Sequence, residues 1–326
     1  MLRELVGDSP VVTIIGLSKN AGKTTAMRQL VGELFDERLA LTSVGRDGES
    51  TDLVTGTEKP SLYVKEGDLF ATARGMLALC DTTCSVEAMT GVVTPLGEVA
   101  VFRALSDGFV QLAGPSSAGQ LPKLNDLFVE LGAQRILIDG AAGRRSLASA
   151  GVSGCTLLCV GAAFDVDMDV VVEETAHICS LFALNKTEVD LSSVEGERFA
   201  LFGEDGGRIP LAVTETGVPS WKDLPQYPCV LWVGGAVTDT TLKALSQHKE
   251  PVTVVVEDCT HILAGRASVD AFYRNGGELQ VRQALRLAGV CANPTAPGGW
   301  NFPPCVFLER LRAAVSLPVI DVKGGC

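Results

Sequence analysis

The feature that most constrains this chain is the stretch of residues 10–25, which reads Pro-Val-Val-Thr-Ile-Ile-Gly-Leu-Ser-Lys-Asn-Ala-Gly-Lys-Thr-Thr. Residues 11–15 are apolar or β-branched, as in a parallel strand that is buried on both faces. Gly16 ends this run, a short polar loop follows, and a helical pattern extends over residues 25–36. A strand, a tight loop and a helix in this order predict a doubly wound α/β fold with a mostly parallel sheet.

The loop has the composition of a phosphate-binding site. Gly16 and Gly22 lack a Cβ, so the backbone can turn tightly and its N–H groups can approach phosphate oxygens. We expect Lys23 to reach the β- and γ-phosphates and to act in catalysis, Thr24 to hold Mg²⁺, and Thr25 to bond the α-phosphate. ATP and Mg²⁺ are therefore the predicted cofactors. The other loop residues expected to contact the nucleotide are Ser18, Lys19, Asn20 and Ala21. The alternative is a glycine-rich turn that binds no ligand.

The spacing of the loop is unusual. In the common form, G-x-x-x-x-G-K-[ST], the first glycine would stand at position 17, but Leu17 is there and Gly16 comes one residue earlier. The longer loop resembles that of dethiobiotin synthetase and its relatives, which implies a P-loop nucleotide-binding fold. Proteins of this class often carry a second lysine in the loop. Lys19 is the candidate for it, although its position relative to Gly22 is not the usual one.

Three acidic residues follow the second predicted strand. Residues 39–45 have the pattern of a strand, and Asp47, Glu49 and Asp52 come directly after it. Ligands gather at the carboxyl ends of parallel strands, so Asp47 is the first candidate for a Mg²⁺ ligand and catalytic group, and Glu49 is the second. For any one of these residues, a solvated acidic turn is an equally good interpretation.

A further acidic residue ends the apolar segment 135–138, which predicts another buried strand. A carboxylate at this place, Asp139, is expected to meet the water shell of Mg²⁺ near Thr24. Arg144 and Arg145 follow, and they are candidates to sense the γ-phosphate or to contact a partner. Many strands end in Asp, so the interpretation of Asp139 depends on the phosphate loop in the same chain.

The composition limits the partners and the compartment. The 326 residues carry a net charge of −12, 46% of them are hydrophobic, and no apolar run is long enough to span a bilayer. We therefore expect a cytoplasmic protein without a nucleic-acid or membrane partner. The ten cysteines include no C-x-x-C pair, which argues against a structural zinc site and favours free thiols that pack as small apolar side chains.

The order of the patterns predicts three parts: a nucleotide-binding domain over residues 1–186, a polar connecting region over 187–228, and a smaller α/β domain over 229–326. Short strands within residues 86–114 are expected to extend one edge of the first sheet in antiparallel fashion. Asp68 is expected to cap a helix that reaches residue 73. The Pro- and Gly-rich loop of residues 293–304 is either a recognition surface or a rigid connector.

Six motifs of the chain resemble those of one family. They are the phosphate loop, Val-Gly-Arg-Asp-Gly-Glu (44–49), Gly-Thr-Glu-Lys-Pro (56–60), Thr-Gly-Val-Val-Thr-Pro-Leu-Gly (90–97), Gly-Pro-Ser-Ser-Ala-Gly (114–119) and Ile-Asp-Gly-Ala-Ala (138–142). The family is the P-loop subunit of the reactivase for lysine 5,6-aminomutase, a cobalamin-dependent enzyme. The resemblance implies an ATP-driven chaperone, with the aminomutase as its protein client and a second ATPase subunit as its partner.

Two alternatives to the chaperone remain open. One is an ATP-dependent synthetase similar to dethiobiotin synthetase, which phosphorylates a carboxylate or carbamate. The other is a nucleotide-dependent adaptor with little turnover. The acidic loop and the cysteines do not separate these three functions.

Overall fold

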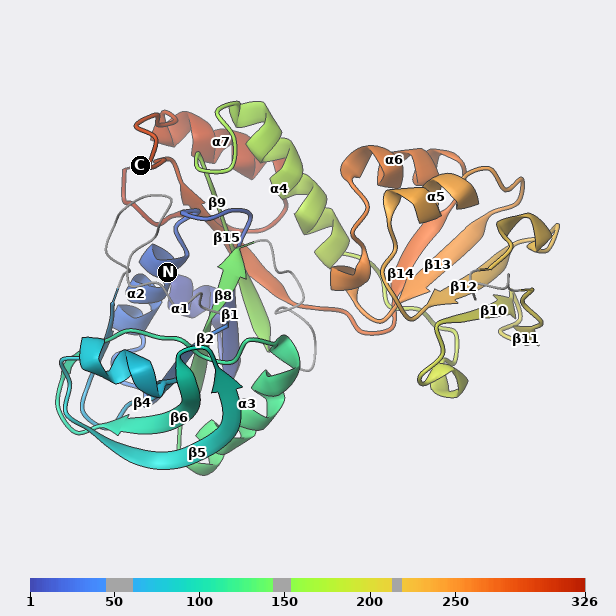
Figure 1. Ribbon diagram of the computed structural model, residues 1–326. Coiled ribbons are helices and arrows are strands. Elements are labelled where there is room, and N and C mark those ends of the chain that lie inside the picture. Colours follow the sequence, from blue (N-terminus) through green and yellow to red (C-terminus); the bar gives the residue numbers. More distant parts are fainter. Residues whose placement is uncertain (45–60, 143–153, 213–218, 326) are drawn as a thin grey trace. The chain divides into compact units, whose positions relative to one another are not determined.

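The larger of two compact units is built on a mostly parallel sheet (Figure 1). The computed structural model describes residues 1–44, 61–142, 154–212 and 219–325, and within them this sheet has nine strands. In spatial order they are β16 (Val319–Asp321), β15 (Leu287–Asn293), β9 (Cys155–Gly161), β1 (Val11–Gly16), β8 (Arg135–Ala142), β2 (Leu39–Ser43), β4 (Leu69–Ala73), β6 (Gly97–Ala104) and β5 (Cys84–Thr94). Neighbouring strands from β16 to β4 run parallel, which confirms the predicted α/β class with a large parallel sheet.

Burial on both faces explains why the apolar runs form central strands. Every residue of β9 and of β15 is buried, so neither strand shows the alternation of a half-exposed sheet. Helix α2 (Lys23–Glu33) follows β1 and buries Met27 and Leu30 in the core, and α1 (Leu2–Val6) packs against it (Figure 1). Among its described residues, the other helices of this unit are α3 (Leu121–Glu130), α7 (Pro304–Ala314), the first part of α4 (Met168–Phe182), and the 3₁₀ turns η1 (Arg74–Leu79) and η2 (Ala118–Gln120). In the described part of the chain, no helix combines the length and the apolar character needed to cross a bilayer.

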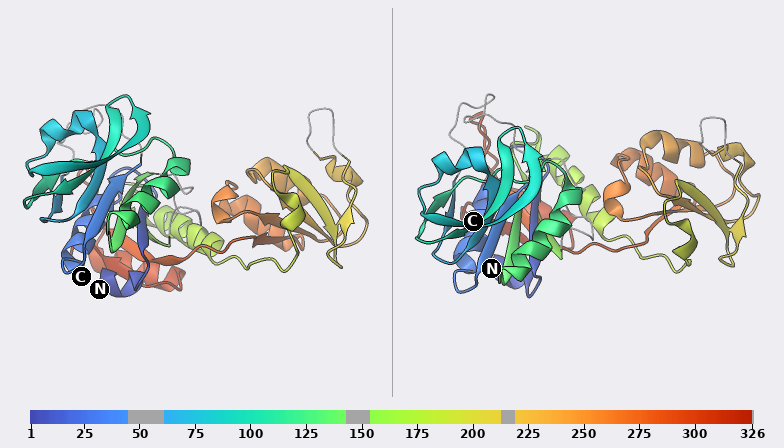
Figure 2. Two further views of the ribbon diagram at one scale, coloured as in Figure 1. Left: turned by 90° about the horizontal axis from the view of Figure 1, so that it is seen from below. Right: turned by 60° about the horizontal axis from the view of Figure 1, so that its bottom comes forward.

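Two antiparallel strands extend one edge of the large sheet, as predicted for residues 86–114. β5 pairs with β6, and β6 pairs with β4 (Figures 1 and 2). The last segment of that region behaves differently, because β7 (Gly108–Val110) pairs with β3 (Leu62–Val64) in a separate two-stranded sheet. Tyr63 and Phe109 stand opposite each other in this pair, with their ring centroids 5.7 Å apart in an edge-to-face contact.

The prediction of a helix after Asp68 is wrong, because the residues that follow it form β4. The Asp68 carboxylate accepts hydrogen bonds from the backbone N–H of Leu39 at 2.9 Å and of Lys65 at 3.0 Å. It therefore joins the start of β2 to the turn before β4. All five residues of β4 are buried in the sheet, and this tertiary packing outweighs the local capping signal.

The chain also divides differently from the predicted parts 1–186, 187–228 and 229–326. One unit comprises Met1–Ala176 together with Arg286–Cys326, and the other comprises His177–Leu285. The last segment thus returns to the large sheet as β15, α7 and β16 instead of belonging to a C-terminal domain. Strands and helices alternate in both units, so the sequence pattern does not show which sheet a strand joins.

The second unit has its own sheet, which within the described residues has five strands. In spatial order they are β11 (Arg208–Ile209), β10 (Phe199–Gly203), β12 (Cys229–Val233), β13 (Val252–Val256) and β14 (Glu278–Val281). The last three run parallel, whereas β10 and β11 are antiparallel and come from the region predicted as a connection. The helices of this unit are the end of α4, α5 (Asp239–Leu245), α6 (Arg266–Arg274), and the 3₁₀ turns η4 (Ser192–Val194), η5 (Trp221–Asp223) and η6 (Cys259–His261).

The cysteines are mostly buried free thiols, as the sequence predicted. Eight of those in the described residues are free, and six of the eight are buried: Cys155, Cys159, Cys179, Cys229, Cys259 and Cys291. Cys305 departs from the prediction, because it is disulfide-bonded.

Candidate functional site

The candidate site is the loop between β1 and α2, at the carboxyl end of the central strand. Helix α2 begins at Lys23, and the preceding Gly22 has the left-handed conformation φ 100°, ψ 11°. Asn20 also has a positive φ, 59°. A Cβ on Gly22 would lie 3.0 Å from the Cβ of Asn293. Position 22 therefore favours glycine for two reasons, the backbone conformation and the close approach of β15.

Lys23 folds back over the start of its own loop. A Cβ built on Gly16 would lie 3.1 Å from Lys23 Cγ and 3.2 Å from Lys23 Nζ. The ammonium group donates to the carbonyl oxygen of Ser18 at 3.5 Å, which is a long hydrogen bond. Glycine at position 16 thus leaves room for the lysine side chain, and the loop holds a cation at its centre.

Asp139 lies on the strand beside this loop. β8 is the direct neighbour of β1, and Asp139 is in register with Ile14. The strand does not end there, as the sequence suggested, but continues to Ala142. Oδ1 of Asp139 is shielded from solvent and has no hydrogen-bond partner in the described part of the chain. Burial raises the pKa of this carboxyl to about 6, although the nearby Lys23 ammonium acts to lower it.

The other loop residues that were predicted to contact the nucleotide differ in how exposed they are to solvent. Ser18 Oγ is buried without a partner among the described residues, and Ala21 is buried. Thr24 and Thr25, on the first turn of α2, are half-buried, whereas Lys19 and Asn20 are exposed. The structure therefore brings together Gly16, Ser18, Lys23 and Asp139. Asp47, Glu49, Asp52, Arg144 and Arg145 lie outside the described residues.

Asn293 belongs to the site, and the sequence analysis did not single it out. It is the last residue of β15, and its Nδ2 donates to the carbonyl oxygen of Asn20 at 3.1 Å. Its Oδ1 accepts hydrogen bonds from the backbone N–H and the hydroxyl of Thr295, at 3.2 and 2.8 Å. The buried amide thus supports the backbone of the β1–α2 loop from a distant segment. A polar residue that ends an apolar run, the pattern that identified Asp139, marks Asn293 as well.

The loop after Asn293 is ordered by its aromatic side chains. Trp300 Nε1 donates to the carbonyl oxygen of Ala162 at 2.9 Å, which ties the loop to the end of β9. The rings of Phe302 and Phe307 lie 5.1 Å apart, so the loop also packs against α7. These contacts hold the loop in place, which fits both the recognition surface and the rigid connector.

Two buried cysteines lie in the layer below the loop. Cys159 and Cys291 are paired residues of β9 and β15, and Leu17 N–H donates to the Cys159 carbonyl oxygen at 3.0 Å. A hydrogen bond between the two thiols, together with burial, raises the pKa of Cys159 well above its usual range. Cys159 is therefore not poised as a nucleophile, and both buried cysteines pack beneath the loop.

Comparison of the chain with protein-family models, with curated proteins and with solved structures gives no match.

Proposed function

We propose that this chain is a P-loop protein that binds and hydrolyses Mg²⁺-bound ATP at the β1–α2 loop. The observation that carries the proposal is the pair Lys23 and Asp139. Lys23 is folded over Gly16 at the start of a helix, and the half-buried Asp139 on the next strand has one carboxylate oxygen, Oδ1, that is shielded from solvent without a hydrogen-bond partner among the described residues. A buried polar atom of this kind costs stability unless a ligand, an ion or water satisfies it.

The residues of the loop fit a triphosphate and its metal ion. The N-terminus of α2 and the backbone N–H groups of the loop favour phosphate oxygens, and Lys23 adds a positive charge. Oxygen ligands suit Mg²⁺. The Thr24 hydroxyl would bind the ion directly, and the Asp139 carboxyl would bind its water shell. Asp47 is proposed as a further ligand and catalytic group. The ion, when bound, neutralises charge on the phosphates.

We further propose that hydrolysis serves a protein client. The motifs that resemble the aminomutase reactivase support a chaperone that acts on a cobalamin-dependent aminomutase together with a second ATPase subunit. A ligand shifts a conformational equilibrium only if it binds the two states with different affinity. A chaperone of this kind therefore needs a surface that differs between the nucleotide-bound states.

An ATPase assay on the purified full chain tests this function. We expect slow basal hydrolysis that is accelerated by the cobalamin-inactivated aminomutase with its partner subunit, and not by small carboxylates or diamines. Asp139→Asn is expected to lower the hydrolysis rate more than the affinity for ATP, whereas Asp126→Asn, on the exposed face of α3, leaves both unchanged. Strong stimulation by a small acid with stoichiometric product would replace the chaperone with a synthetase. An Asp139→Asn protein with the parental rate across a magnesium titration would remove Asp139 from the metal shell.

A further inference from the structure

The second unit contains a pocket of about 520 Å³ at the carboxyl ends of its three parallel strands. Gly234, Glu257 and Arg282 line it, and each is the first residue after β12, β13 or β14. In open α/β sheets, ligands bind in the crevice outside the carboxyl ends of the strands. The volume lies in the range of small-molecule sites. All the residues that line this pocket belong to the second unit, so it is separate from the β1–α2 loop.

The wall opposite these strand ends is the turn of residues 194–198, and it is fixed in place. Trp232 Nε1 donates to the carbonyl oxygen of Glu197 at 3.1 Å, and Gly234 N–H donates to that of Arg198 at 2.9 Å. A Cβ on Gly234 would lie only 2.4 Å from the Glu197 carbonyl oxygen, so this close approach needs glycine. The pocket is therefore built by specific contacts, which reduces the cost of ordering it around a ligand.

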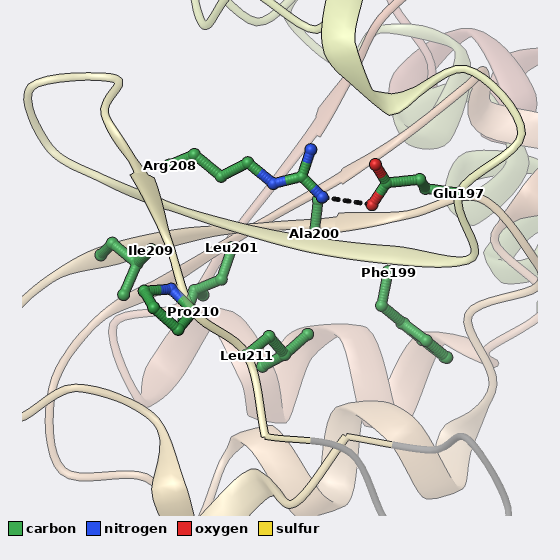
Figure 3. A pocket seen from close by; sticks show the side chains of 8 residues that line it. All are labelled: Glu197, Phe199, Ala200, Leu201, Arg208, Ile209, Pro210 and Leu211. Atoms are coloured by element: carbon green, nitrogen blue, oxygen red, sulfur yellow. Dashed lines mark hydrogen bonds and ion pairs between the residues drawn. The ribbon is translucent and has the colours of Figure 1, made fainter.

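Two of the acidic side chains of the pocket already have partners. Glu257 accepts hydrogen bonds from Arg282 at 3.4 Å and from Gln283 at 2.8 Å. Glu197 is paired with Arg208, whose guanidinium points at the Glu197 carboxylate in the adjoining pocket (Figure 3). Glu195 also lines the pocket, but it lies on the exposed rim. The carboxylates of Glu197 and Glu257 are thus already paired with donors of the protein.

The cationic side chains keep donors available. Arg198 is exposed at the rim, as Glu195 is. Its guanidinium lies 5.6 Å from the ring centroid of Phe199 and has no ion pair among the described residues. His261 Nδ1 lies 3.3 Å from Asp258 Oδ1, while its Nε2 has no hydrogen-bond partner in the described part of the chain. The hydrogen bond to Asp258 raises the pKa of His261 and favours its charged form. A ligand rich in acceptors matches these unused donors.

We propose that this pocket binds a small organic anion, through a carboxylate or phosphate group held by Arg198 and His261. Arginine and protonated histidine form charge-assisted hydrogen bonds with such groups. Arg282, which contacts Glu257 at 3.4 Å, also lines the pocket and adds positive charge. The site is independent of the nucleotide and gives the second unit a ligand of its own.

Calorimetric titration of the full chain tests the proposal, with citrate and inorganic phosphate as separate probes and putrescine as a cationic control. The titrations use a Lys23→Ala background, so that the β1–α2 loop does not contribute phosphate binding. Arg198→Gln and His261→Gln are compared with Arg274→Gln, an exposed arginine of α6 that does not line the pocket.

We expect saturable binding of at least one anion at one site per chain. Arg198→Gln and His261→Gln should each raise Kd by about tenfold or more, as for the loss of a charge-assisted hydrogen bond, and Arg274→Gln should leave it unchanged. Binding of citrate alone identifies a carboxylate ligand, and binding of phosphate alone a phosphate ligand. Failure of both anions to bind, equal binding by all three variants, or preferential binding of putrescine would overturn the proposal.

Discussion

Asn293 holds the β1–α2 loop through Asn20, although their sequence positions differ by 273. The hydrogen bond from Asn293 Nδ2 to the Asn20 carbonyl oxygen crosses from the end of β15 to a residue with positive φ. The conformation of the loop thus depends on a strand that the chain adds only after the whole second unit.

Replacement of Asn293 tests this dependence. Asn293→Ala leaves the Asn20 carbonyl oxygen without its partner, and we expect it to weaken ATP binding by about tenfold, corresponding to about 1–2 kcal/mol. The matched control is Asn275→Ala, at an exposed position that follows α6 in the second unit. Titration of both variants with Mg²⁺-bound ATP checks the prediction, and equal affinities would show that Asn293 does not organise the loop.

Alanine substitutions at Gly22 and Gly67 distinguish the effect of backbone strain from the effect of a clash with β15. Both have positive φ, 100° and 92°, but a Cβ on Gly67 would meet nothing within 4 Å. We expect Gly22→Ala and Gly67→Ala each to lower the free energy of unfolding by about 1 kcal/mol or more. Only Gly22→Ala should also weaken ATP binding, because its Cβ presses on Asn293. Chemical denaturation and calorimetry measure the two effects, and a parental ATP affinity for a folded Gly22→Ala protein would contradict this account of the loop.

Asp139 is expected to lower the stability of the nucleotide-free protein. Burial raises its pKa to about 6, so its ionised form at neutral pH is held at a cost. Asp139→Asn removes that charge and should raise the free energy of unfolding without nucleotide by about 1–3 kcal/mol at pH 7. Asp126→Asn is the exposed control. Thermal unfolding of the two variants in the absence of nucleotide decides the matter, and a destabilised Asp139→Asn protein would indicate that the carboxylate is already well paired.

The raised pKa of His261 leads us to expect that the stability of the second unit depends on pH. The hydrogen bond to Asp258 raises the pKa of His261 above its ordinary value of 6.5. The folded state therefore binds more protons than the unfolded state just above pH 6.5, and stability falls as the pH rises through the folded pKa. Urea unfolding followed by tryptophan fluorescence between about pH 5 and 8 should show this slope in the parent and in His248→Gln, but not in His261→Gln. The same slope in all three proteins would assign it to other groups.

Local chemistry made the β1–α2 loop predictable from sequence. Gly16, Gly22 and Lys23 lie within one short segment, and the need for positive φ and for space beneath the lysine is visible in the residue types. The parallel sheet followed from apolar runs that are buried on both faces.

The rest of the fold could not be predicted, because it depends on which strands pair across long sequence separations. β15 has the same apolar character as β12, yet one joins the large sheet and the other the second sheet. The role of Asn293 depends on that pairing, so it became apparent only when β15 was placed beside β9. Asp68 shows the same limit at shorter range. The sequence alone does not distinguish an aspartate that caps a helix from one that accepts hydrogen bonds from a strand residue, Leu39, and a turn residue, Lys65.

Calorimetric titration of Mg²⁺-bound ATP into the parent chain, Lys23→Ala and Lys123→Ala tests the central claim most directly. Lys23 lies over Gly16 and is proposed to bind the phosphates, whereas Lys123 is exposed on α3. We predict one site per chain in the parent and in Lys123→Ala, and a loss of affinity of about a hundredfold or more in a folded Lys23→Ala protein. Unchanged affinity in folded Lys23→Ala protein would contradict the assignment of the β1–α2 loop as the nucleotide site.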